Sequence, residues 1–239
     1  MPLPFVKYST LVVMIRVLLI LSLLINGLAC LAKEKQVIKI QLKHMLNQRS
    51  LNENKSTVNA FNDSLTVYKW QYYLSRFFVT DSITGKQTII SKKPVLVNAF
   101  DTSDIMLEIP GGNYSQIGFT VGVDSIYNVS GVQTGDLDPV KAMFWTWQTG
   151  YIHLKAEGYS PQSKAPFKKF TYHIGGFRHP YNTNRTVSLN YIKNNESLVI
   201  KVDLEPLFNV MSVKENASIM SPNTAAINLA DAIPLMFSL

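Results

Sequence analysis

The sequence predicts an all-β protein: a single-domain antiparallel β-sandwich that follows an N-terminal signal peptide. Short segments rich in β-branched and aromatic residues alternate apolar and polar side chains, which is typical of half-buried strands. Gly, Asn and Pro turn signals separate these segments, and helical periodicity is almost absent. A hydrophobic content of 46% with 16% charged residues suits a folded domain with a substantial core.

The first 32 residues predict a secretory signal peptide. Arg16 precedes the apolar run VLLILSLLINGLAC, which ends in small residues. A basic segment, a short apolar core and a small-residue exit mark such a signal, and the apolar core is too short for a comfortable membrane span. We therefore expect an exported protein, periplasmic or anchored to the outer membrane, with residues 33–239 as its folded domain.

Cys30 is the only cysteine of the chain and lies at the end of this apolar run. A small residue before such a cysteine resembles a bacterial lipoprotein cleavage site, although Gly27 stands where leucine is usual. Two alternatives stay open: lipidation of Cys30, which would give a membrane lipid anchor, or ordinary cleavage after Ala29 or Ala32. In either case the folded domain has no internal disulfide and no thiolate ligand.

The remaining chain predicts strands in succession. VIKIQLKH places His44 at the end of an apolar row, and LTVYKWQYYLSRFFVTDS predicts one long or bent strand. Further short strands follow, separated by the turns TGK, PGG and NNE. Residues 125–143 are Gly- and Asp-rich and too long for an ordinary hairpin loop, which indicates function or a structured lid. NTAAINLADAI predicts a short helix near the C-terminus.

Charge and motifs exclude several function classes. The formal net charge is +7, but the lysines are scattered and form no dense Lys/Arg block, so we expect no nucleic-acid binding. The sequence contains no nucleotide-binding or hydrolase motif, and no nucleophile–base pair or paired carboxylates at a motif spacing. We therefore do not expect an enzyme.

The tryptophans and histidines are the candidate site residues. In MFWTWQTGYIHLKAEG, Trp145 and Trp147 share a face if the segment is a strand, and the simplest interpretation is that both indoles fill the core. A histidine on a core face, as predicted for His44, must be hydrogen-bonded or bind a ligand. His173 precedes two glycines at a strand end. The spacing of the four histidines neither supports nor excludes a metal site; the other two are His153 and His179.

Several stretches resemble the MbnP-like copper-binding proteins, in particular the Bacteroidetes forms. They are IPGGNYSQIGFTVGVDSIYNVSGVQTGDLDPVKAMFWTWQTGYIHLKAEG, then FTYHIGGF, with IKIQLKHMLNQRSL as the family's first strand and YKWQYYLSRFFV as its next aromatic strand. The resemblance spans roughly residues 37–205. It implies an exported β-sandwich protein of the cell envelope that binds one copper ion and acts in copper handling.

The resemblance also implies a ligand set. Its metal-binding histidines fall on His44 and His173, and the tryptophan that a diheme MauG-like partner oxidises to kynurenine falls on Trp145 or Trp147. Without cysteine, imidazole is the natural copper ligand, and two histidines suit Cu(I). An indole offers only an N–H donor, whereas kynurenine adds an aryl amine and a carbonyl. The alternative is a structural or adhesive envelope protein that binds no metal.

Overall fold

The computed structural model describes residues 13–17, 35–51, 56–101, 104–191 and 197–239. The chain divides into two compact units, residues 1–36 with 110–112 and residues 37–109 with 113–239. Residues 13–17 are helical, and no helix in these described ranges is both long and apolar enough to cross a membrane. Cys30 and the predicted turn at residues 194–196 lie outside the described residues, so both stay predictions.

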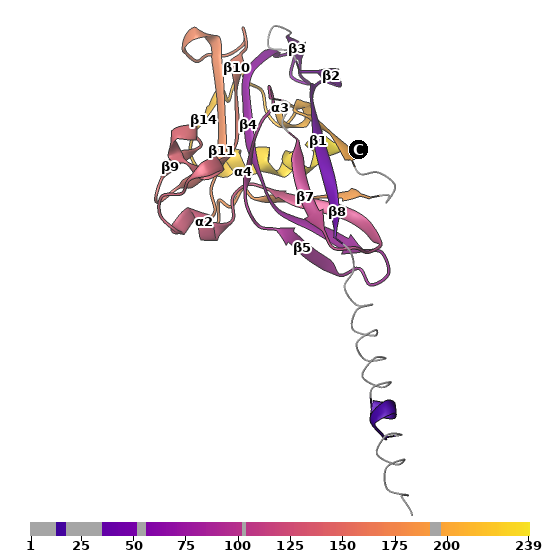
Figure 1. The fold of residues 1–239 in the computed structure, drawn as a ribbon. Coiled ribbons are helices and arrows are strands. Elements are labelled where there is room, and N and C mark those ends of the chain that lie inside the picture. The colour runs from indigo at the N-terminus through magenta and orange to yellow at the C-terminus, as the bar shows by residue number, and fades with distance from the viewer. Residues whose placement is uncertain (1–12, 18–34, 52–55, 102–103, 192–196) are drawn as a thin grey trace, which may run out of the picture. The chain divides into compact units, whose positions relative to one another are not determined.

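The strands form two sheets, which confirms the predicted β-sandwich class (Figure 1). The ten-stranded sheet runs β12-β8-β4-β10-β11-β14, with β3, β5 and β6 paired to β4 and β9 paired to β10. The five-stranded sheet runs β15-β13-β1-β2, with β7 paired to β1. Their bounds are β1 Gln36–Leu46, β2 Arg49–Ser50, β3 Thr57–Val58, β4 Ser64–Asp81, β5 Gln87–Ser91, β6 Val95–Asn98, β7 Ile105–Ile109, β8 Tyr114–Val121, β9 Phe144–Thr146, β10 Gly150–Tyr159, β11 Lys169–Gly175, β12 Arg185–Asn190, β13 Ser197–Asp203, β14 Ser218–Ile219 and β15 Phe237–Ser238.

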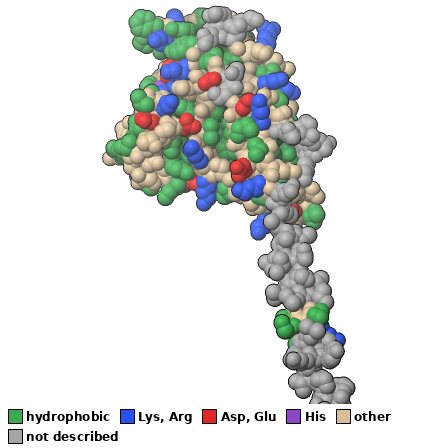
Figure 2. Space-filling model, viewed as in Figure 1, with side chains coloured by type: hydrophobic (Ala, Val, Ile, Leu, Met, Phe, Trp, Pro, Cys, Tyr) green, Lys and Arg blue, Asp and Glu red, His purple; other side chains and the backbone are tan. Residues whose placement is uncertain are grey.

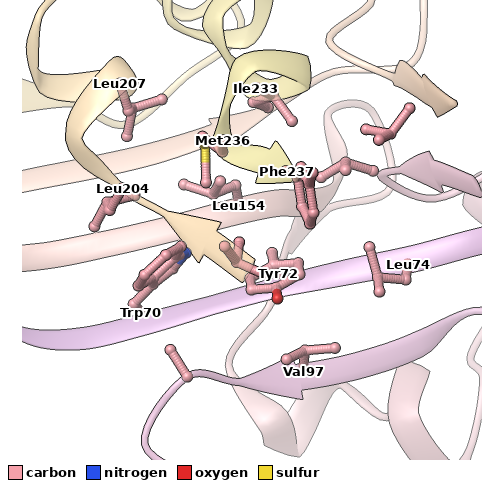
Figure 3. Packing of buried hydrophobic residues seen from close by; sticks show 14 of the residues in the cluster. Trp70, Tyr72, Leu74, Val97, Leu154, Leu204, Leu207, Ile233, Met236 and Phe237 are labelled. Carbon is pink, nitrogen blue, oxygen red and sulfur yellow. The ribbon is translucent and has the colours of Figure 1, made fainter. Parts of the chain in front are cut away.

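Strand β4 is the centre of the larger sheet. It is 18 residues long and pairs with β10 over its first half and with β8 over its second half. Trp70, Tyr72 and Leu74 alternate onto one face and are fully buried there, near Phe237 of β15 (Figure 3). Arg76 has a φ of 48°, and the pairing with β8 shifts register beside it. The predicted long or bent strand is therefore confirmed, with its irregularity at Arg76.

Most strand pairs are antiparallel, as predicted, but β1 runs parallel to β13 and β11 runs parallel to β14. Parallel neighbours need a long connection, whereas antiparallel neighbours can be joined by a tight turn. Every strand of the larger sheet except β14 lies between β1 and β13 in the chain, so a long connection separates these two strands and a parallel pairing is possible. This pairing places His44 opposite Val202.

The main core lies between the sheets and beneath the C-terminal helices. It joins Trp70 and Tyr72 to residues of β13, β15, α3 (Glu205–Phe208), α4 (Thr224–Ala232) and the 3₁₀-helix η4 (Ile233–Met236). Helix α4 confirms the predicted short helix, and the Asn223 side chain caps it by accepting a hydrogen bond from the Ala226 N–H at 2.8 Å. On the face shown in Figure 2, basic and acidic side chains are interspersed.

Residues 125–143 form a structured cover over the other face of β4 and β10. The segment contains α2 (Ser125–Val129) and the 3₁₀-helices η1 (Gly135–Leu137) and η2 (Pro139–Lys141). The Tyr73 and Tyr151 hydroxyls donate to the backbone carbonyls of Asp136 and Leu137, each at 2.8 Å. A second, smaller core lies beneath it, made of Tyr73, Val123, Leu137, Met143, Tyr151 and Ile152.

Asn128 ties this cover to β10, and its removal should destabilise the fold. Its side chain is 2% exposed, accepts from the Tyr151 N–H at 2.9 Å and donates to the Asp124 carbonyl at 3.1 Å. We expect Asn128→Ala to lower the free energy of unfolding by about 1–3 kcal/mol, because it leaves a buried N–H unpaired. Urea denaturation measures this. Val140→Ala, at an 81% exposed position of the same segment, is the control and should change little.

Candidate functional site

His44 lies on the core-facing row of β1, between Leu42 and Leu46, and contacts two aromatic residues of β4. Its Nε2 lies 2.8 Å from the Tyr72 hydroxyl, and its ring centroid lies 5.1 Å from that of Trp70. Burial lowers the pKa of His44 to about 4 and raises the pKa of Tyr72 well above its usual value. At neutral pH the imidazole is therefore uncharged and the phenol keeps its proton. The predicted placement of His44 on the core face is confirmed.

Trp70 packs against His44, and the hydrogen-bonding capacity of its indole N–H is not satisfied within the described structure. Its side chain is fully buried, and Nε1 has no hydrogen-bond partner within the part of the chain that the structure describes. The indole and imidazole planes meet at 79°, an edge-on contact. Figure 3 shows Trp70 and Tyr72 side by side on β4. A buried N–H without a partner costs about 1–3 kcal/mol, so this is a polar atom that packing alone does not explain.

His173 lies on β11 and is held by a carboxylate. Its Nε2 is 2.8 Å from Oε1 of Glu157 on β10, and Lys155 is its direct cross-strand neighbour. Burial lowers the pKa of His173, against the opposing effect of the hydrogen bond to Glu157. The neutral imidazole therefore donates its Nε2–H to the carboxylate, and the lone pair is left on Nδ1.

His44 and His173 lie on opposite faces of the ten-stranded sheet. Tyr172 and Ile174, on either side of His173, point into the main core, so His173 points to the other face. His44 contacts Trp70 and Tyr72 on the core face. The structure thus does not bring the two predicted ligands together. In the described residues, no group of three or more His, Cys, Asp or Glu side chains is placed to hold a metal ion.

The tryptophan pair is divided as well. Strand β9 ends at Thr146, so Trp147 lies in the turn before β10, 54% exposed, and does not share a strand face with Trp145. Trp145 packs on Gly175, where an added Cβ would lie 2.9 Å from its ring. The Nε1 of Trp145 is buried without a partner in the described structure. Because Gly175 is two residues beyond His173 on β11, Trp145 lies on the face of His173, away from His44.

His153, which the sequence left unassigned, is the most buried imidazole. It is fully buried on β10, where the register with β11 shifts, and its Nδ1 lies 2.9 Å from the Thr183 hydroxyl. Its Nε2 has no partner among the described residues. Burial, and secondarily the charge of Arg185, lower the pKa of His153 to about 3. His179 lies exposed in the loop after β11, as expected for a loop residue.

Three residues that contact His44 or His173 were not singled out from the sequence: Trp70, Tyr72 and Glu157. The alternation of β4 predicts that Trp70 and Tyr72 share a face, but nothing local predicts that β1 crosses them. Glu157 follows Lys155 at strand spacing, which places both on one face, but its contact with His173 depends on the register between β10 and β11.

The comparisons with known proteins agree with this architecture. The MbnP family model matches residues 35–221. The chain belongs to the MbnP family. A solved structure, MbnP from Methylosinus trichosporium, has a TM-score of 0.59 and 14% sequence identity, covering 81% of this chain and 87% of that chain. This likeness shows a shared fold. No curated protein sequence matches the chain.

The buried imidazole of His153 should make the stability of this MbnP-family protein sensitive to acid. Between pH 6.5 and about 3 the unfolded histidine binds a proton that the folded one does not, so stability falls as the pH falls through this window. His44, with a pKa of about 4, adds to the effect in the same direction. We expect His153→Asn to flatten the dependence. Urea denaturation from pH 7 to 4 tests this, with His179→Asn as the exposed control; an unchanged slope in His153→Asn would contradict it.

Proposed function

We propose that this protein is an exported copper-binding protein of the cell envelope, which binds one copper ion and acts in copper handling. Membership of the MbnP family and the predicted signal peptide support this function. The observation that carries it is His44, a neutral and largely buried imidazole beside the unsatisfied indole of Trp70.

The donor set around His44 fits copper. A neutral imidazole is a suitable copper ligand, and the folded domain contains no cysteine to compete with it. Among the described residues the Nε2 of His44 is hydrogen-bonded to the Tyr72 hydroxyl alone, a contact that a metal could replace. We propose that copper binds at His44 on the core face, with Tyr72 orienting the ring.

A tryptophan-derived kynurenine would supply a further donor. An indole N–H cannot bind a metal, whereas the aryl amine and carbonyl of kynurenine can. Trp70 is the tryptophan in contact with His44, whereas Trp145 packs on Gly175, two residues beyond His173. We therefore propose Trp70 as the residue that a diheme MauG-like partner would oxidise, in place of Trp145 or Trp147.

The separation of the histidines favours a second candidate, a structural or adhesive envelope protein without metal. His44 and His173 each have a hydrogen-bond partner, Tyr72 and Glu157, and lie on opposite faces of one sheet. Such satisfied histidines are common in cores. Copper content decides between the two functions.

The test is copper content and peptide mass of protein purified from its native host and supplied with copper. We expect one copper per chain, a loss of affinity of at least about tenfold in His44→Gln, and retention in His173→Gln. Lys43→Gln, at an exposed neighbour of His44, is the control. Peptide mapping should place kynurenine at residue 70.

Each other outcome contradicts part of the proposal. Equal losses in His44→Gln and His173→Gln would mean that both histidines bind copper in a rearranged sheet. Loss in His173→Gln alone would move the site to the face of Trp145. No copper in the unaltered protein would establish the structural alternative.

A further inference from the structure

A surface pocket of about 350 Å³ lies beside the start of β10 and the end of β11, and His44 does not line it. Its walls come from the β9–β10 turn, the β11–β12 connection and the segment before α4. Gly176 joins these walls: it has a φ of 128°, and an added Cβ would lie 2.3 Å from the Tyr181 carbonyl oxygen and 3.2 Å from Pro222. The lining residues are Gln148, Thr149, Gly176, Phe177, Arg178, His179, Tyr181, Ser221 and Pro222.

The pocket contains one arginine and several side chains that can donate hydrogen bonds. Arg178 stacks on Phe177, with the guanidinium carbon 4.9 Å from the ring centroid, and it forms no ion pair with any described residue. None of the nine lining residues is acidic. The side chains of Gln148, His179, Tyr181 and Ser221 can all donate hydrogen bonds. A cationic ligand would meet no counter-charge here, whereas an anion would meet a guanidinium and neutral donors.

The apolar part of the lining sets the rest of the ligand. Phe177, Pro222 and the ring of Tyr181 give the pocket flat apolar surfaces beside the guanidinium. The volume is at the lower end of the range for small-molecule sites, which suits a single ring or a short chain. The Arg178 guanidinium lies within cation–π range of the Phe177 ring, and a guanidinium can form paired hydrogen bonds to a carboxylate or a phosphate.

We propose that this pocket binds a small organic anion, a carboxylate or phosphate ester on a single-ring or short-chain body, with Arg178 as its charge partner. Binding here is independent of copper, because no lining residue belongs to the surroundings of His44.

The test is isothermal titration of the full folded protein with benzoate, phenyl phosphate and the neutral isostere benzamide. We expect saturable binding of at least one anion in the millimolar range or tighter, and benzamide to bind at least about tenfold more weakly. Comparison of benzoate with phenyl phosphate identifies the preferred head group.

Variants separate the pocket from general charge attraction. Arg178→Gln should weaken anion binding by about tenfold or more, whereas Arg49→Gln, which removes an equal charge from an exposed position on β2, should not. Gly176→Ala should also weaken it, because the new Cβ meets backbone. Equal binding of benzoate and benzamide, equal effects of Arg178→Gln and Arg49→Gln, or no saturation by either anion would each overturn the proposal.

Discussion

The alternation of side chains along β4 is the constraint on which the rest of the structure depends. This strand is covered on both faces near its middle, by the main core on one side and by the segment 125–143 on the other. Consecutive residues must therefore serve different cores: Tyr72 packs toward Phe237, whereas Tyr73 packs toward Tyr151. Strand β10 obeys the same rule, with Leu154 in the main core and Lys155 donating to the Ala142 carbonyl on the other face.

This two-sided burial also determines the chemistry of the imidazoles. Each of His44, His153 and His173 has a lowered pKa, with desolvation as the largest cause, so all three are neutral at physiological pH. The hydrogen-bond partner of each imidazole then determines which ring nitrogen carries the proton and which carries the lone pair. Glu157 fixes the proton of His173 on Nε2, whereas Tyr72 can donate to His44 at the same atom. The fold thus fixes the tautomer of His173 and holds the His44 ring against the Tyr72 hydroxyl.

The local pattern predicted a large part of this fold. Alternation placed His44 on the core face, identified β4 as one long strand, and the length of 125–143 indicated a structured cover. Relations between distant segments were not predictable, because the parallel pairing of β1 with β13 and the register of β11 are set by packing between sheets. Trp147 was predicted on a strand and lies in a turn, since β9 is only a three-residue strand. Trp70, which contacts His44, was not predicted as a site residue, because every aromatic residue of its strand is equally suited to a core.

The two candidate histidines lie on opposite faces of the larger sheet, and each has a tryptophan in its neighbourhood. On the core face His44 contacts the buried indole of Trp70. On the opposite face His173 lies two residues from Gly175, on which Trp145 packs. Neither indole N–H has a hydrogen-bond partner among the residues that the structure describes. Evolution rarely leaves buried donors without partners unless they have another use. The sheet therefore carries one histidine–tryptophan neighbourhood on each face. Because the sheet itself lies between them, a single copper ion can use only one neighbourhood unless the strands rearrange. The core-face neighbourhood has the direct ring contact, so the argument for copper rests on His44.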